Sequence, residues 1–283
     1  MQLVVLSNVV AAIDRAKCVK LDAYVLGRGA VFHALERAAD RGADVSVNLC
    51  DSPAGKDDAK KWLASIASDL RDHGVRVVAN PGVGSGSIHA KVAIVDDRVF
   101  YDDRNWRSSG GNDAILSADI DEALPIRSKA QVIAEEAALI RSGAGHEILV
   151  ATESFGPGPI ARALLERAQR GDDVRLIYNA TESTHGRENA LAELRGVGVR
   201  IEQSDNNHKL ACVGDRVWVG SANATVTGGD TGLGLEWGTE LRGAQAAKLD
   251  AQAERLWHEA DPSLCGHALA CDIRDPFLRS VLG

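Results

Sequence analysis

The chain contains one hairpin sequence twice, as KVAIVDDRVFYDDRN (residues 91–105) and as KLACVGDRVWVGSAN (residues 209–223). The two copies align without a gap and share the first Lys, a central Asp-Arg-Val, an aromatic residue and the final Asn. In each copy, apolar residues flank an Asp-Arg turn, which is typical of two antiparallel strands joined by a tight turn. This self-similarity predicts a repeated structural unit.

The segments that lead into each hairpin are duplicated as well. Each copy has a strand pattern, a helix ending at Arg-Gly and a second strand pattern, found in CVKLDAYVL with AVFHALERAADRGADVSVNLC and in HEILVATES with PIARALLERAQRGDDVRLIYN. A further helix pattern (57–73 and 187–196) then leads into a Gly-Val strand in both copies. Alternating helices and strands predict a sheet covered by helices.

We therefore expect an α/β fold of two homologous repeats, each a mixed β-sheet covered by helices. The first repeat is expected over residues 1–125 and the second over 126–283, with a helix over 127–142 connecting them. The N-terminal segment, MQLVVLSNVVAAIDRAK, is expected to form the first helix. Its apolar stretch has no basic residues before it and is interrupted by Asp14 and Arg15, so a secretory signal or spanning helix is not expected, and we expect a cytoplasmic protein.

The composition is that of a soluble globular protein, with 283 residues, 45% hydrophobic and 25% charged. A net charge of -8 argues against broad electrostatic capture of nucleic acid or of an anionic membrane, although a small cationic cleft fits on an acidic body. The five cysteines include no CxxC pair, which favours free thiols in a reducing compartment. Cys265, His267 and Cys271 lie close together in the sequence but lack a fourth ligand, so no metal site is expected there.

The first hairpin begins with His89-Ala90-Lys91, and residues two apart in a strand point to the same face. A histidine there can act as a nucleophile or as an acid–base group, and a lysine can hold a phosphate oxygen. In the second copy, Lys209 matches Lys91, but Asn207 stands opposite His89 and His208 follows one residue late. A regular strand would turn His208 to the other face, whereas a bulge would turn it inward. The sequence leaves both arrangements open.

The duplicated hairpin, the spacing HxKxxxxD (His89, Lys91, Asp96) and Gly220-Ser221-Ala222-Asn223 resemble the HKD signature of the phospholipase D superfamily. That family is also a repeat of two α/β halves, so the resemblance spans nearly the whole chain. It implies one site shared by both halves and a metal-independent, two-step displacement at phosphorus through a phosphohistidine. No cofactor is expected.

The resemblance also implies roles for individual residues. It makes His89 the nucleophile, His208 the general acid, and Lys91 and Lys209 the phosphate-binding lysines. Asn105, Ser221 and Asn223 correspond to polar groups that bind substrate. Asp113 and Glu236 fall where the family places a carboxylate that orients a histidine, and we expect Asp113 to serve His89 because both lie in the same half. Gly214 in place of Asp, and Asp102-Asp103 in the first copy, depart from the signature.

Three functions are consistent with this resemblance. The first is a nuclease that cleaves phosphodiesters in DNA or RNA, which the absence of an apolar rim or interfacial helix favours. The second is a phospholipase D or phosphatidyl transferase, and the third is a catalytically impaired binder of phosphate or nucleic acid, which Asn207 and Gly214 would explain. The expected partner is a phosphodiester substrate without stable membrane association, and the oligomeric state is left open.

Overall fold

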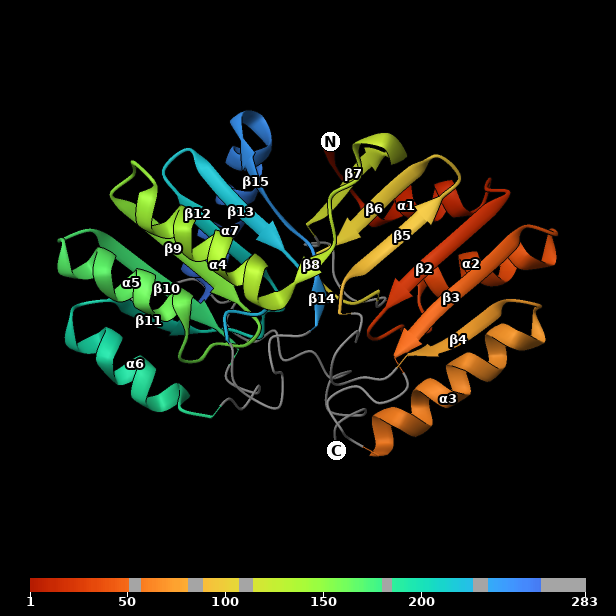
Figure 1. Ribbon diagram of the computed structural model, residues 1–283, viewed down its shortest axis with the longest axis horizontal. Coiled ribbons are helices and arrows are strands. Elements are labelled where there is room, and N and C mark those ends of the chain that lie inside the picture. The colour runs from red at the N-terminus through yellow and green to blue at the C-terminus, as the bar shows by residue number, and fades with distance from the viewer. Residues whose placement is uncertain (51–56, 81–88, 107–113, 180–184, 226–233, 261–283) are drawn as a thin grey trace.

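The structure, a computed structural model, describes residues 1–50, 57–80, 89–106, 114–179, 185–225 and 234–260. These residues form two α/β halves that lie side by side, the first coloured red to yellow and the second green to blue in Figure 1. Each half has its own sheet, and helices cover the outer face of each sheet.

The sheet of the first half has the strand order β1-β7-β6-β5-β2-β3-β4. Its strands are β1 (Gln2–Val4), β2 (Cys18–Ala23), β3 (Asp44–Cys50), β4 (Arg76–Asn80), β5 (Lys91–Val95), β6 (Arg98–Asp102) and β7 (Ile115–Asp119). The helices of this half are α1 (Leu6–Ile13), α2 (Ala30–Asp40) and α3 (Asp57–Asp72), followed by the 3₁₀ turn η2 (Ile120–Glu122). The N-terminal segment predicted as one helix is therefore a short strand followed by a helix.

The second sheet has the order β11-β10-β9-β12-β13-β15. Its strands are β9 (Glu147–Thr152), β10 (Asp173–Tyr178), β11 (Arg200–Gln203), β12 (Lys209–Val213), β13 (Arg216–Gly220) and β15 (Gly238–Arg242). Its helices are α4 (Lys129–Ser142), α5 (Pro159–Gln169), α6 (Arg187–Gly196) and α7 (Gly243–Ala260). A two-stranded ribbon pairs β8 (Arg127–Ser128) with β14 (Leu235–Glu236).

The two sheets repeat one topology. In each, three parallel strands (β2-β3-β4 and β9-β10-β11) continue into three antiparallel strands (β5-β6-β7 and β12-β13-β15). The prediction of two α/β repeats, each a mixed sheet covered by helices, is confirmed. The helix expected between the repeats is present as α4, and the repeat boundary at residue 125 stays a prediction.

The same turns recur because the same residues form them. The helices α2 and α5 are each followed by a glycine in the left-handed conformation, Gly42 (φ +91°) and Gly171 (φ +88°), as the repeated Arg-Gly predicts. The hairpin turns also need a positive φ, at Asp96 (+52°) in the first copy and at Gly214 (+61°) in the second. Glycine adopts this conformation without a Cβ penalty. The departure at Gly214 is therefore compatible with an intact hairpin.

Three apolar clusters hold the molecule together. One packs the first sheet against α1, α2 and α3, and a second packs the other sheet against α4, α5 and α6. The third contains inward residues of both sheets, such as Val92, Tyr101, Leu210 and Val219, together with Trp257 of α7. The two duplicated hairpins thus share one core, which brings the chain segments before β5 and β12 into the same region.

Candidate active site

His89 lies directly before β5, where the second half holds both its backbone and its ring. Its backbone N–H and that of Ala90 donate to the carbonyl oxygen of Leu235, at 3.1 and 2.8 Å. This contact brings the next residue, Glu236, onto the ring, and His89 Nδ1 lies 2.9 Å from Glu236 Oε1 and 3.1 Å from Oε2. A carboxylate on Nδ1 fixes the ring and favours the tautomer that carries its proton on Nδ1 and its lone pair on Nε2. Glu236, from the second half, therefore orients His89.

Ser221 forms a hydrogen bond to the carboxylate of Glu236. The Ser221 hydroxyl donates to Glu236 Oε2 at 2.5 Å and accepts from the Trp237 N–H at 3.0 Å. Both Ser221 and Glu236 are buried. Ser221 was predicted to bind substrate, but the structure commits its hydroxyl to Glu236.

Lys91 points to the same side of β5 as His89, as the spacing of two residues predicts. Its Nζ lies 2.8 Å from His89 Nδ1 and 3.0 Å from Nε2, and 5.7 Å from the centre of the Tyr24 ring. Tyr24 also packs edge-on against the imidazole, with ring centres 4.5 Å apart. The first half therefore contributes an imidazole, an ammonium group and a phenol to one cluster.

Lys209 enters the same cluster from the second half. Its Nζ donates to Glu153 Oε2 at 2.9 Å and to the Asn207 carbonyl oxygen at 3.0 Å. The Asn207 side chain lies beside the same carboxylate, 3.3 Å from Glu153 Oε1 in the orientation in which its amide nitrogen donates. Asn207, Lys209 and Glu153 thus form the second half's part of the site.

Charge interactions link the groups of the two halves. Burial lowers the pKa of His89, and Glu236 opposes this shift while Lys91 and Lys209 add to it. Burial also lowers the pKa of Lys91 to about 7, against the attraction of Glu236 and with the repulsion of Lys209. A neutral imidazole is the nucleophilic form. His89, beside ammonium groups that suit phosphoryl oxygens, is therefore a candidate nucleophile.

Both carboxylates of the site are kept ionised. Burial raises the pKa of Glu236, but His89, Lys91 and the Ser221 hydroxyl outweigh it, and the pKa falls to about 2. Burial likewise raises the pKa of Glu153, but Lys209, Lys91 and His89 outweigh it and lower the pKa to about 2. The cationic groups thus balance two carboxylates, which explains how so many charges are buried together.

His208 does not join this cluster. Its backbone carbonyl accepts from the Glu153 N–H at 2.9 Å, so the chain pairs regularly at this point and forms no inward bulge. The alternation of the strand then turns the ring to the inner face of the sheet, where Nδ1 lies 3.2 Å from Asp103 Oδ2 and Nε2 lies 3.5 Å from Gln252 Nε2. Asn207, not His208, occupies the position of the second histidine.

The remaining predicted residues fall into three groups. The side-chain oxygens of Asn105 and Asn223 are buried without a hydrogen-bond partner in the described part of the chain, which keeps both as candidates for contact with a ligand. Asp96 accepts from the backbone N–H groups of Lys17 (3.0 Å) and Cys18 (2.9 Å), so it stabilises the fold. Asp113, expected beside His89, lies outside the described residues, as do Cys265, His267 and Cys271.

The two extra acids of the first hairpin are buried. Burial, reinforced by the neighbouring Asp103, raises the pKa of Asp102 well above its ordinary value. The Asp102 carboxylate accepts from the Arg104 N–H at 3.0 Å, and Asp103 accepts from the Ala114 N–H at 3.0 Å while its other oxygen faces His208. Both acids have partners in the protein and are not open to substrate.

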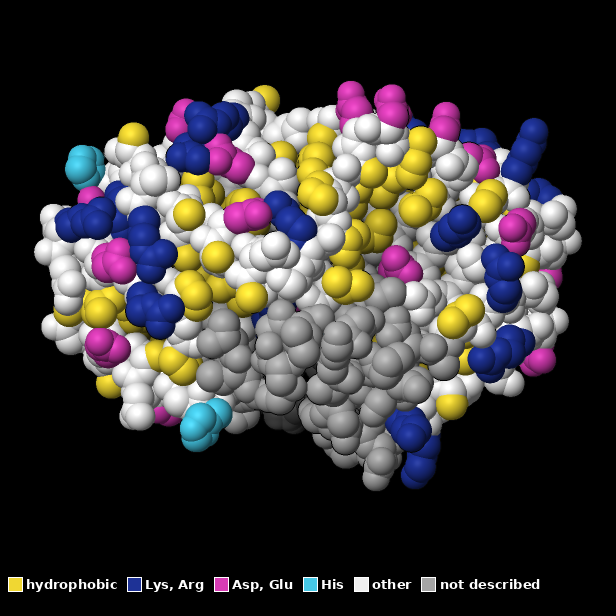
Figure 2. All heavy atoms as spheres, viewed as in Figure 1, with side chains coloured by type: hydrophobic (Ala, Val, Ile, Leu, Met, Phe, Trp, Pro, Cys, Tyr) yellow, Lys and Arg dark blue, Asp and Glu magenta, His cyan; other side chains and the backbone are white. Residues whose placement is uncertain are grey.

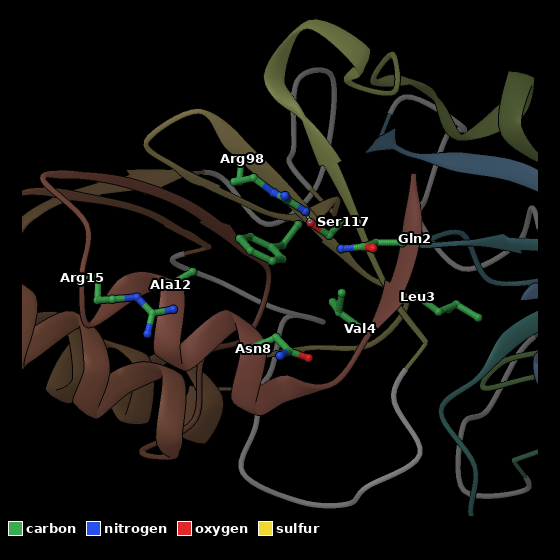
Figure 3. A pocket seen from close by; sticks show the side chains of 9 residues that line it. Gln2, Leu3, Val4, Asn8, Ala12, Arg15, Arg98 and Ser117 are labelled. Atoms are coloured by element: carbon green, nitrogen blue, oxygen red, sulfur yellow. Dashed lines mark hydrogen bonds between the residues drawn. The ribbon is translucent and has the colours of Figure 1, made fainter.

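A cavity of about 500 Å³ lies elsewhere in the first half, between α1 and the strands β1, β6 and β7 (Figure 3). Arg98, Phe100 and Ser117 line it, and Arg98 Nη2 donates to Ser117 Oγ at 2.6 Å. Arg98 pairs with Val95 at the far end of β5 from Lys91. This cavity is therefore separate from the cluster around His89.

The described residues contain no group of three or more His, Cys, Asp or Glu side chains placed to hold a metal ion. Within those residues, too, no helix is both long and apolar enough to cross a membrane. The cysteines that can be described, Cys18, Cys50 and Cys212, are free thiols. The cluster's own groups are an oriented imidazole, two lysines and two carboxylates, a set suited to displacement at phosphorus.

Comparison with known proteins agrees with this description. Residues 138–257 match the family model described as "Cardiolipin synthase, PLD-like domain". The sequence finds no match among curated proteins. Polyphosphate kinase from Porphyromonas gingivalis has a similar structure, with a TM-score of 0.54 and 16% identity over 89% of this chain and 49% of that chain. The chain thus spans about half the length of that kinase, and the likeness shows a shared fold.

Two further solved structures are similar over a smaller part of the chain. Nuc from Salmonella typhimurium, a phospholipase D family member, has a TM-score of 0.43 and 17% identity over 49% of this chain and 96% of its own. NucT from Helicobacter pylori has a TM-score of 0.41 and 17% identity over 48% of this chain and 94% of its own.

Proposed function

We propose that this chain, which belongs to the phospholipase D superfamily, is a phosphodiesterase that cleaves nucleic acid with His89 as its nucleophile. The observation that carries the proposal is the contact of Glu236 with His89 Nδ1, at 2.9 Å, beside Lys91. Such a carboxylate directs Nε2 toward the substrate and stabilises the cation that forms when the ring attacks. Lys209 supplies a second positive charge from the opposite half.

The proposed reaction has two steps. In the first, His89 Nε2 forms a bond to phosphorus while the bond to the leaving oxygen breaks. In the second, water attacks the phosphohistidine and the P–N bond breaks, which returns the electron pair to His89. The ammonium groups of Lys91 and Lys209 hold the phosphoryl oxygens as His89 attacks, and the free carboxamide oxygens of Asn105 and Asn223 are available to hydroxyl groups of the substrate.

Nucleic acid is proposed over lipid because the described surface offers little for a bilayer to bind. Its exposed large apolar side chains are Met1, Val5, Val78, Ile120 and Ile126, which come from separate segments rather than from the strand ends that carry the site. Figure 2 shows basic and acidic side chains intermixed over both halves on the face in view. Recognition would therefore depend on the charges of the site itself and not on a broad basic surface.

A second candidate function rests on Asn207. An amide in the position of the second histidine cannot donate a proton to a leaving oxygen as an imidazolium can, so a protein that binds phosphodiesters without cleaving them is the alternative. The two candidates differ in one measurable property, which is turnover of a substrate whose leaving group needs no proton.

The test uses bis(p-nitrophenyl) phosphate, whose nitrophenolate leaves without protonation, together with single-stranded DNA, RNA and phosphatidylcholine vesicles. The proposal expects turnover of the activated ester and of at least one nucleic acid. His89→Ala should lower both by about 10⁴-fold or more, because a nucleophile cannot be bypassed. Binding of nucleic acid with no turnover of the activated ester would favour the binder, and cleavage of vesicle lipid alone would favour a phospholipase.

His208→Ala is the matched control for this experiment. It also removes a buried imidazole, but one that faces Asp103 and Gln252. We expect it to lower the melting temperature while the activity of the folded protein stays within about threefold of the unchanged chain. A loss as large as that of His89→Ala would return His208 to the role of general acid.

A further inference from the structure

The register of the two repeats identifies which residues are equivalent at the site. An isolated bridge joins Leu26 to Trp106 in the first half and Phe155 to Ala224 in the second, so Leu26 corresponds to Phe155. Counting back two residues, Tyr24 corresponds to Glu153. The hairpins already place Asn207 opposite His89.

The two halves therefore differ at two neighbouring positions of the site. The first half combines His89 with Tyr24, whose rings are in contact at 4.5 Å, whereas the second half combines Asn207 with Glu153. The half with Asn207 in place of the site imidazole is the half with a carboxylate at the neighbouring position. Glu153 also interacts through charge with Lys91 and His89 of the first half.

The position of Glu153 is well defined by its contacts. It directly follows β9, and its backbone N–H donates to the His208 carbonyl oxygen at 2.9 Å. Its Oε2 accepts from Lys209 Nζ at 2.9 Å, and its Oε1 faces the Asn207 amide. The side chain is 19% exposed, whereas that of Lys209 is 1% exposed, so the carboxylate forms the accessible end of the pair.

We propose that the Glu153–Lys209 pair supplies the acid–base chemistry that a histidine would supply at the position of Asn207. The inference rests on the proposed function, because it assigns the proton transfers of that two-step reaction. The proposal places the leaving oxygen on the side of this pair, opposite the attacking nitrogen of His89. The same side receives the water of the second step.

The proton balance closes over one cycle. In the first step, the leaving oxygen takes a proton from the Lys209 ammonium group as its bond to phosphorus breaks. In the second step, Glu153 takes a proton from the attacking water as the O–P bond forms and the P–N bond breaks. That proton then passes from Glu153 to the Lys209 amine across the 2.9 Å hydrogen bond, which restores the starting state.

The test separates the two steps with bis(p-nitrophenyl) phosphate. Its first step needs no acid, but the second still needs a base, so Glu153→Gln should release one nitrophenolate per protein rapidly and then turn over about 100-fold more slowly than the unchanged chain. The phosphoryl group should be found on His89 by mass spectrometry of the quenched protein. Adding Asn207→His to Glu153→Gln should restore turnover, because an imidazole then stands in the equivalent position.

Glu147→Gln is the control, since it removes a carboxylate from the exposed start of the same strand and should leave turnover unchanged. The inference is overturned if Glu153→Gln turns over normally, or if both steps slow together with no burst, which is the result of a purely structural role. Failure of the proposed function looks different: the unchanged chain would then show no turnover, or turnover that survives His89→Ala.

Discussion

The protonation state of Lys91 should make the activity depend on pH. Its ammonium group, buried beside His89 and repelled by Lys209, has a pKa of about 7. Above that pH the free protein loses the proton and with it one phosphate-binding charge. We expect kcat/KM for the activated diester to fall by about tenfold per pH unit above pH 7.

Lys91→Arg tests this assignment, because a guanidinium group stays protonated throughout the range. The descending limb of the kcat/KM profile should move up by more than one pH unit in the variant, even if its maximum is lower. A limb that stays at the same pH in Lys91→Arg would mean that another group loses the proton.

The alignment of the repeats was sufficient to predict His89, Lys91 and Lys209 as members of one site, because identical spacing in two hairpins requires equivalent positions. It could not choose between Asn207 and His208, since that depends on whether the chain before β12 is regular. It also assigned the orienting carboxylate by nearness in sequence. In the structure Glu236 from the other half lies against His89, because the backbone of Leu235 holds His89 and Ala90, whereas Asp113 lies outside the described residues.

Glu153 was missed for a related reason. Its role depends on the register between β9 and β12, which makes it the counterpart of Tyr24. A carboxylate after a strand carries no signal of its own in a single sequence. The signal that could have found it is the comparison of the two repeats at the ends of their first strands, where Tyr in one copy faces Glu in the other.

Among the helices, α4 carries an unusual buried acid. Glu136 is 3% exposed, and burial raises its pKa from 4.5 to about 8. In the unfolded chain the same carboxylate ionises near pH 4.5, so the folded state binds the proton more tightly between these two values. Glu136 should therefore make the free energy of unfolding decrease as the pH rises from 4.5 to 8.

Glu136→Gln removes that dependence while keeping the size of the side chain. We expect its melting temperature to exceed that of the unchanged chain by about 2–5 °C at pH 8, with a difference that shrinks toward pH 5. Glu193→Gln, at an exposed position of α6, is the control and should change neither value. An equal shift for Glu136→Gln at both pH values would show that packing, not ionisation, is responsible.

The elements themselves were largely predictable, because periodicity and Arg-Gly helix ends occur in both copies and support each other. The exception is the N-terminus, where β1 forms by pairing with β7, more than a hundred residues away in sequence. Local periodicity in an apolar segment does not distinguish such a strand from the first turn of a helix.

Taken as a whole, the molecule builds its site only where the two halves meet. Among the described residues, the first half contributes the imidazole of the cluster, and the second half contributes its two carboxylates, Glu236 and Glu153. This division follows from the shared core, because packing the duplicated hairpins together brings the chain segments before β5 and β12 to one place. Duplication thus gives the two halves freedom to diverge in role while their folds stay equivalent.

The charges assembled in this way also determine how the site should respond to metal ions. The two carboxylates of the cluster, Glu236 and Glu153, are already paired with His89 and with Lys209, at 2.9 Å in both cases. A divalent cation would have to displace these partners and approach two ammonium groups, which its charge opposes. We therefore expect protein stripped of metal and assayed in EDTA to hydrolyse the activated diester at a rate within about twofold of untreated protein.

The measurement needs a positive control, for which a metal-dependent phosphodiesterase treated in parallel must lose its activity. Lys209→Met provides a matched variant, because it leaves Glu153 without its ion-pair partner and so opens a carboxylate to cations. Added Mg²⁺ should affect that variant more than the unchanged chain. If stripped, unchanged protein is inactive and Mg²⁺ or Zn²⁺ restores it, then the lysines do not supply the positive charge that the reaction requires, and the roles proposed for Lys91 and Lys209 are wrong.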